Sequence, residues 1–161
     1  MSTYKAEQTS SSILQSFAID GPTASGKSVI GRALALRLAL YFCDTGLMYR
    51  AATLAVLSQE IPLDQESAII QCVQAAAIDL RWESPETPLV LIGSEDVTDR
   101  LKSPDIDSTV SKVARLNDVR SVLVSRQRMI ADRSPVVMVG RDIGKAILPE
   151  ARAKVFVDAT L

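Results

Sequence analysis

Histidine is absent from this sequence of 161 residues, and cysteine occurs only twice. Without histidine there is no Ser-His-Asp triad, no histidine general base and no histidine-ligated zinc site. Chemistry in this chain must therefore use Asp, Arg, Lys, hydroxyl groups and metal ions. Two cysteines favour a reducing compartment over a disulfide framework. The net charge of −1 and the pI near 5.5 give no global field to attract nucleic acid or an anionic membrane surface.

Long hydrophobic runs are also lacking. The longest, around residues 33–42, is interrupted by Arg37 and is too short to cross a bilayer. Residues 1–14 are polar and serine-rich, without the apolar centre of a secretory signal or the arginines of a transit peptide. We therefore expect a soluble, cytoplasmic protein with a disordered tail at 1–14. Residues 15–161 should form one globular domain, since 47% hydrophobic residues suffice for a core.

One stretch dominates the sequence. The apolar residues 17–19 are typical of a short strand, and they precede the pattern G-x-x-x-x-G-K-S from Gly21 to Ser28 and a helical pattern beginning near Ser28. This order is that of a phosphate-binding P-loop. We expect Gly21 and Gly26 to adopt positive φ and let the backbone approach a phosphate, with the following helix N-terminus adding positive potential. Lys27 would reach the β- and γ-phosphates, and the Ser28 hydroxyl would bind Mg²⁺.

Periodicity along the remaining chain predicts alternating helices and strands. We expect helices starting near 28 and at about 47–58, 65–77, 104–115 and 118–132, and strands at 41–43, 136–139 and 154–158. This order predicts an α/β fold, a doubly wound parallel sheet with helices on both faces. Alternating residues between 78 and 98 predict a small antiparallel insert, about 78–100, in which Trp82 packs rather than binds ligand.

Finer expectations follow from the same patterns. In the first helix Ile30, Ala33, Leu34 and Leu38 should face the sheet. Asp64 and Asn117 should cap helices. Arg126, Arg128 and Arg133 are interpreted as solvated charges on a helix face.

Two arginines follow glycine-containing turns at the ends of predicted strands. These are Arg50 and Arg141, at the sheet edge where ligands bind in open α/β folds. A guanidinium group matches phosphate oxygens bidentately, so the pair predicts a second phosphorylated ligand opposite the P-loop. The second pKa of a nucleoside monophosphate is about 6, so its phosphate is already an anionic nucleophile at neutral pH. Phosphoryl transfer between two phosphates needs no general base and suits this chain.

Other P-loop functions fit less well or stay open. A GTPase would carry the base-recognition pattern N-K-x-D, which is missing, and a motor or transport ATPase would have an acid where Val139 stands. Two alternatives remain. One is a kinase for another small metabolite, and the other is a non-catalytic module that binds a nucleotide or a partner.

The motifs, taken in order, resemble those of the bacterial-type cytidylate kinases, a family of P-loop nucleoside monophosphate kinases. The resemblance runs from about residue 16 to residue 161. It is carried by Ile19–Ser28, Asp44-Thr45-Gly46-Leu47-Met48-Tyr49-Arg50, Gly93-Ser94-Glu95-Asp96-Val97-Thr98, Ser111-Lys112-Val113-Ala114, Val119-Arg120, Arg126-Gln127-Arg128 and Gly140-Arg141-Asp142-Ile143-Gly144.

The resemblance implies transfer of the ATP γ-phosphoryl group to CMP or dCMP with Mg²⁺ as cofactor, and a monophosphate-binding region at about 45–116. The implied ATP-binding residues are Gly21, Pro22, Thr23, Ala24, Ser25, Gly26, Lys27, Ser28 and Val29, with Ser28 also as the metal ligand. The implied substrate-binding residues are Thr45, Arg50, Ser111, Arg120, Arg141 and Asp142, and the implied catalytic residues are Lys27, Arg50 and Arg141.

This chain departs from the family pattern at three places. Val139 stands where family members carry an acid, and Lys145 stands where they carry threonine. Family members also continue past the strand ending at Asp158 with an arginine-bearing lid, whereas this sequence stops at Leu161. We expect a monomer with an exposed apolar edge strand at 154–157. We also expect weak binding of ATP and CMP and slow turnover.

Overall fold

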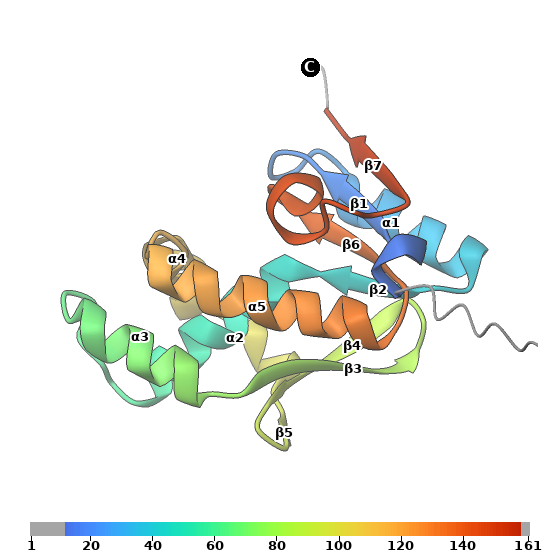
Figure 1. The fold of residues 1–161 in the computed structure, drawn as a ribbon. Coiled ribbons are helices and arrows are strands. Elements are labelled where there is room, and N and C mark those ends of the chain that lie inside the picture. The colour runs from blue at the N-terminus through green and yellow to red at the C-terminus, as the bar shows by residue number, and fades with distance from the viewer. Residues whose placement is uncertain (1–11, 159–161) are drawn as a thin grey trace, which may run out of the picture.

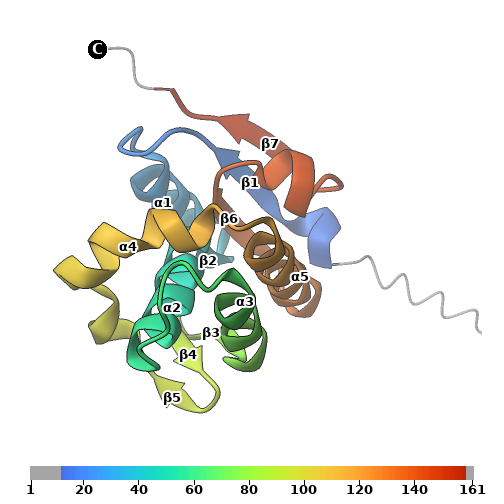
Figure 2. The same cartoon turned by 90° about the vertical axis from the view of Figure 1, so that its left-hand side faces the viewer.

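The computed structural model describes residues 12–158. Its main sheet has four parallel strands in the order β2-β6-β1-β7, formed by Tyr41–Asp44, Val136–Gly140, Phe17–Asp20 and Ala153–Phe156 (Figure 1). Helices flank this sheet on both faces, so the predicted α/β architecture is confirmed (Figure 2). β7 forms one edge, and its Phe156 is 69% exposed, as expected of an apolar edge strand.

The helices lie within a few residues of the predicted ranges. They are α1 (Lys27–Leu38), α2 (Thr45–Ser58), α3 (Glu66–Ala75), α4 (Pro104–Ala114) and α5 (Asn117–Arg133), with short 3-10 helices η1 (Ser12–Gln15) and η2 (Thr98–Leu101) and a π-helical turn η3 (Ile143–Ile147). Both predicted caps were wrong, because Gln65 precedes α3 and Leu116 precedes α5, each without a side-chain cap bond. Within residues 12–158, no helix has the length and hydrophobicity that a bilayer span requires.

Ordered structure begins before residue 15. Helix η1 leads into Ser16, whose buried hydroxyl donates to the carbonyl of Ser12 at 2.9 Å and accepts the N–H of Val136 at 3.0 Å. Residues 12–14 of the predicted tail are therefore structured and tied to the sheet. The rest of that tail, residues 1–11, lies outside the described residues.

Two hydrophobic clusters cover the two faces of the sheet. The smaller one lies under α1 and consists of Ile19, Ala35, Phe42, Val137 and Val139. The larger one includes the alternate strand residues Ala18 and Met138, together with residues of α2, α5 and η3. The period of two in each strand divides the side chains between these faces.

The predicted buried stripe of α1 was wrong except at Leu34, which is half-buried and packs against the cluster under this helix. The buried residues of this helix are Gly31 and Ala35, while Ile30 is 47% exposed. A Cβ atom on Gly31 would lie 2.4 Å from Cγ1 of Val139, so α1 contacts the sheet through its smallest residues. Close approach of the helix backbone decides which residues are buried here, and hydrophobic periodicity does not.

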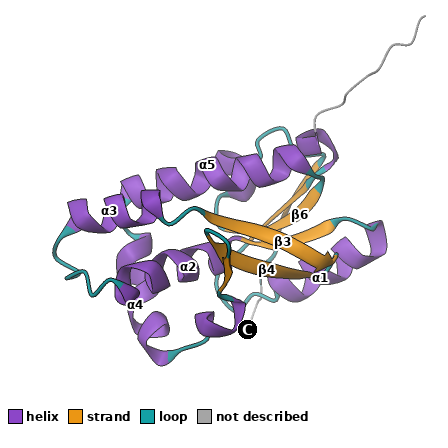
Figure 3. Cartoon of the chain, turned by 90° about the horizontal axis from the view of Figure 1, so that it is seen from below, coloured by secondary structure: helices purple, strands orange, loops and turns teal. Residues whose placement is uncertain are grey.

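The antiparallel insert consists of β3 (Ile78–Ser84), β4 (Thr87–Ile92) and β5 (Glu95–Asp96), seen below the main sheet in Figure 1 and from beneath in Figure 3. Its hairpin docks on the free edge of β2. Trp82 donates its indole N–H to the carbonyl of Phe42 at 2.7 Å, and the N–H of Phe42 donates to Pro85 at 2.7 Å. The Trp82 ring also contacts Tyr41, with centroids 5.0 Å apart. The predicted packing role of Trp82 is confirmed.

Three arginines of α5 were interpreted as solvated charges, and although Arg128 and Arg133 are exposed, all three make specific contacts with neighbouring segments. Arg126 donates to the carbonyls of Val73, Gln74 and Ile78, Arg128 donates to those of Ala146 and Ile147, and Arg133 pairs with both carboxylate oxygens of Asp79. The side chains of Arg126 and Arg128 reach carbonyl groups near the ends of α3 and η3, where a cation is favourable. Helix α5 is therefore tied by its arginines to three neighbouring segments.

Replacing Trp82→Phe should remove the indole hydrogen bond while keeping a ring against Tyr41. We expect the free energy of unfolding to fall by about 1 kcal/mol, the usual value for one such bond. Urea denaturation would show this as a lower midpoint with an unchanged slope. Trp82→Leu, which also removes the ring contact, should lose more. Equal midpoints for the Phe variant and the wild type would contradict the docking role of this bond.

The ion pair of Asp79 with Arg133 predicts a pH dependence of stability. Burial alone would raise the pKa of Asp79, but hydrogen bonds from Arg133 and from the N–H of Leu80 outweigh it and lower the pKa. The unfolded value is about 3.9, so the pair stabilises the fold above that pH and its contribution disappears as pH falls through the lower folded value.

We therefore expect Asp79→Asn to lower the free energy of unfolding near neutral pH by about 0.5–1 kcal/mol, as for exposed pairs. The difference from wild type should vanish in acid. A series of urea titrations across pH, with Asp132→Asn as a control on the exposed face of α5, measures this. A difference that persists unchanged in acid would show that the carboxylate charge is not its cause.

Candidate active site

The P-loop connects β1 to α1 as predicted, but its two glycines are required for different reasons. Gly26 has φ of +85°, with open space where a Cβ would lie. Gly21 does not have positive φ, so that expectation was wrong. Instead, a Cβ on Gly21 would lie 2.3 Å from the carbonyl oxygen of Val157. Ala24 supplies the other left-handed residue of the loop, with φ of +63°. These residues shape a tight loop whose backbone is accessible.

Polar groups of the loop point inward. The Ser25 hydroxyl is buried, and it has no hydrogen-bond partner among the described residues. Lys27 folds its ammonium group onto the carbonyl of Pro22 at 2.7 Å. The first N–H groups of α1 lack intrahelical partners and lie at the loop. Phosphate oxygens would give all of these donors partners, so the loop fits a polyphosphate. Val29, the last of the implied ATP-binding residues, is 75% exposed.

Asp20 connects the P-loop strand to the turn that follows β6. Its side chain accepts the N–H of Ile143 at 2.6 Å and the N–H of Gly144 at 2.9 Å. This places Arg141 and Asp142 at the same edge of the sheet as the P-loop. Asp142 adopts the left-handed conformation, with φ of +59°, immediately before η3.

A polar cluster forms beside that turn. Arg120 on α5 lies 3.8 Å from the carboxylate of Asp142. Burial raises the pKa of Tyr49 on α2, and the nearby guanidinium groups of Arg120 and Arg141 offset part of this effect. Three predicted substrate-binding residues are therefore brought together, and their binding roles stay predictions. Sequence reasoning missed Tyr49 as a member of this cluster, although it lies in a quoted motif.

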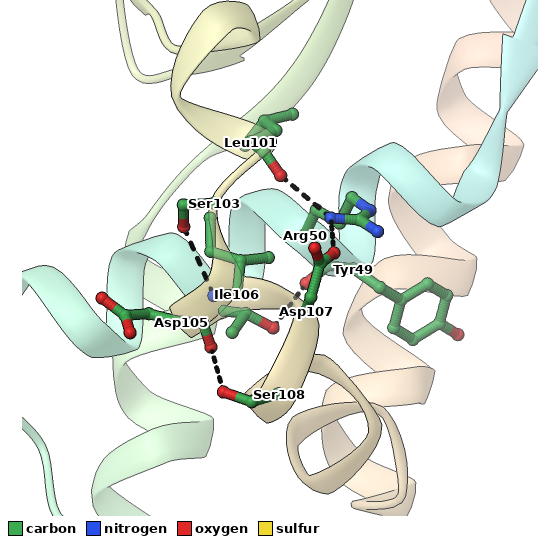
Figure 4. A network of polar contacts seen from close by, with 9 residues as sticks. Tyr49, Arg50, Leu101, Ser103, Asp105, Ile106, Asp107 and Ser108 are labelled. Carbon is green, nitrogen blue, oxygen red and sulfur yellow. Dashed lines mark hydrogen bonds and ion pairs between the residues drawn. The ribbon is translucent and has the colours of Figure 1, made fainter.

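Arg50 is not part of that cluster. Consecutive residues on a helix point about 100° apart, so Arg50 and Tyr49 extend in different directions from α2 (Figure 4). Arg50 donates to the carbonyl of Leu101 at 3.0 Å and pairs with Asp107 of α4 at 2.7 Å. This predicted phosphate ligand is therefore held by η2 and α4. A bound phosphate would have to compete with Asp107 for it.

The remaining predicted residues have diverse environments. Thr45 is buried, and its hydroxyl donates to the carbonyl of Val139 at 3.0 Å. Ser111 is exposed on α4, and Lys145 is exposed on η3. Cys43 and Cys72 are not joined by a disulfide, and burial raises the pKa of both thiols, which disfavours thiolate chemistry.

Ser28, the predicted metal ligand, pairs with Asp44, an acid of a quoted motif to which the sequence assigned no role. Its hydroxyl donates to Oδ2 of Asp44 at 3.0 Å, while Oδ1 of Asp44 accepts the N–H of Gly46 at 3.0 Å and caps α2. Hydroxyl and carboxylate oxygens are the hard ligands that suit Mg²⁺. Within residues 12–158 no group of three or more cysteine or acidic side chains could hold a metal ion. Mg²⁺ at Ser28 would therefore be shared with nucleotide phosphates and water.

Comparisons with known proteins indicate the family of this chain. The family model described as Cytidylate kinase matches residues 17–161. Curated relatives named cytidylate kinase include those of Geobacillus sp. (strain WCH70), 43% identical over 144 residues, and Desulforamulus reducens (strain MI-1), 43% identical over 143 residues. Each match covers 89% of this chain and 64% of the relative, so the chain spans less than two thirds of their length. By the extent of the family match, the chain belongs to the cytidylate kinase family.

Proposed function

We propose that this chain transfers the γ-phosphoryl group of ATP to CMP or dCMP, giving CDP or dCDP. The observation that supports this most directly is the double hydrogen bond of Asp20 to Ile143 and Gly144. It holds a turn bearing Arg141 and Asp142 at the same sheet edge as the P-loop. On this proposal, the donor and acceptor nucleotides would bind at one edge of the sheet. Membership of the cytidylate kinase family supports the same reaction.

On the donor side, the P-loop would bind the ATP phosphates. The unpartnered Ser25 hydroxyl and the folded-back Lys27 would turn to phosphate oxygens. Lys27 would then stabilise charge that develops on the transferring group. The Ser28 hydroxyl would bind Mg²⁺, which when bound neutralises phosphate charge.

On the acceptor side, the cluster of Arg120, Arg141 and Asp142 would bind CMP. The Asp142 carboxylate can accept a hydrogen bond from the exocyclic amino group of cytosine, which uracil lacks. Arg141 would bind the phosphate through two parallel hydrogen bonds. A CMP phosphate oxygen then forms a bond to the γ-phosphorus as the bond to the bridging oxygen of ADP breaks. The attacking oxygen is already anionic, so no base is required.

Turnover measurements with the purified chain test this proposal. We expect ADP production that depends on CMP and is weaker with UMP. Asp142→Asn should weaken CMP binding about 10- to 100-fold, the loss of one charge-assisted hydrogen bond, and should reduce the preference for CMP over UMP. Asp132→Asn removes the same charge from an exposed place on α5 and should have no effect.

The alternatives give different results in the same assay. Nucleotide binding without ADP production would favour a non-catalytic module. ADP production with alcohol acceptors in preference to CMP would favour a kinase for another metabolite. Either result would refute the proposal.

The ion pair of Arg50 with Asp107 yields a separate prediction for the acceptor. In Asp107→Asn the carboxylate no longer competes for the guanidinium group, so CMP should bind up to about fivefold more tightly, given the strength of exposed pairs. Cytidine, which has no phosphate, should bind the variant and wild type equally. Calorimetry of both ligands measures this. Weaker CMP binding in the variant would show instead that Asp107 orients Arg50 for the phosphate.

A further inference from the structure

We infer that Asp44 positions Mg²⁺ at the P-loop, acting through Ser28 and supplying the negative charge that Val139 cannot. This inference rests on the proposed binding of ATP with Mg²⁺. Asp44 lies at the end of β2, in a motif that the sequence showed but to which it assigned no role for this residue.

The register places Asp44 beside Val139 on the face covered by α1. Asp44 is the aligned partner of Val139 in the β2–β6 pair. Neighbouring residues in a parallel register share a face, and residues two apart in a strand share one too. Phe42 and Val139 both belong to the cluster under α1, so Asp44 points to that face. Ser28 lies in the first turn of α1, which accounts for its contact with Asp44.

The other carboxylates at this edge are already used elsewhere. Asp20 follows Ile19, which faces α1, so its side chain lies on the opposite face and accepts two N–H groups there. Asp142 lies on the turn and faces Arg120. Among the described acids at the ends of β1, β2 and β6, Asp44 is the one whose carboxylate bonds to the P-loop serine.

The two oxygens of Asp44 have separate tasks. Oδ1 caps α2 through Gly46, which fixes the orientation of the carboxylate. Oδ2 takes the hydroxyl hydrogen of Ser28, so the lone pairs of the serine oxygen stay available as metal ligands. A carboxylate that hydrogen-bonds to a metal ligand orients that ligand and strengthens metal binding. Loss of such a carboxylate commonly lowers the metal affinity about 10- to 100-fold.

Asp44→Asn separates this role from helix capping. The amide oxygen can still accept the N–H of Gly46, but the charge beside Ser28 is lost. We expect wild type to bind ATP more tightly with Mg²⁺ than with EDTA, and Asp44→Asn to lose about tenfold or more of that gain. Its affinity for metal-free ATP should stay equal or rise, because a negative charge near the phosphates is removed. Calorimetric titration with ATP under the two conditions measures both quantities.

Two further variants complete the test. Asp132→Asn, with the same change in charge on α5, should keep the full Mg²⁺ gain. Asp44→Asn combined with Val139→Asp places a carboxylate on the neighbouring strand, about 4.8 Å away and on the same face. Thermal unfolding checks that this double variant is folded. The folded double variant should recover part of the Mg²⁺ gain. If it does not fold, the single variant still decides. An unchanged Mg²⁺ gain in Asp44→Asn would overturn the inference, as would a wild type that binds ATP equally with and without Mg²⁺.

These outcomes are distinct from failure of the proposed function. Wild type that binds ATP with a Mg²⁺ gain but transfers nothing to CMP would overturn the function alone. A purely structural role for Asp44 would lower the unfolding temperature and metal-free ATP affinity together, leaving the ratio of affinities with and without Mg²⁺ unchanged. That pattern would also overturn the inference.

Discussion

The carboxylate of Asp20 is the interaction on which the arrangement of the site depends. Its hydrogen bonds to the N–H groups of Ile143 and Gly144, at 2.6 and 2.9 Å, connect the strand before the P-loop to the turn after β6. Bonds to a charged acceptor contribute about 1.5–3 kcal/mol each. Strand alternation makes this possible, because Ile19 faces α1 and Asp20 faces η3. One residue thus fixes the turn after β6 beside the P-loop.

Small residues set the distances around that connection. Gly31 brings α1 against Val139, and Gly21 brings the P-loop against the backbone of Val157. A larger residue in place of Gly21 would push the P-loop away from the backbone of Val157. A larger residue in place of Gly31 would push α1 away from the side chain of Val139. Because protein interiors tolerate little change in volume, such a shift would move the P-loop. The same close approach also places Ser28 within hydrogen-bonding reach of Asp44 at the end of β2.

The sequence predicted what depends on local pattern. The element order, the P-loop and the insert around Trp82 follow from periodicity and turn residues, which neighbouring residues along the chain determine. The failures have a different origin. The buried side of α1 depends on how closely Gly31 approaches the sheet, and the carbonyl contacts of Arg126 depend on where α3 ends. The role inferred for Asp44 depends on strand register, which no single segment of sequence specifies.

Two arginines of the predicted acceptor site already have acidic neighbours within the protein. Arg50 pairs with Asp107, and Arg120 lies near Asp142. Binding a nucleotide there exchanges one ion pair for another, so the gain depends on how much better the ligand satisfies the guanidinium group. Asp107 shares Arg50 with the carbonyl of Leu101, whereas a phosphate dianion offers three oxygens and a larger charge. In an exchange of this kind, the phosphate contributes far more to the binding free energy than the sugar or the base does. A nucleoside has no phosphate to displace Asp107 from Arg50, so its affinity should be low. The acidic partners of the arginines thus favour the phosphorylated ligand.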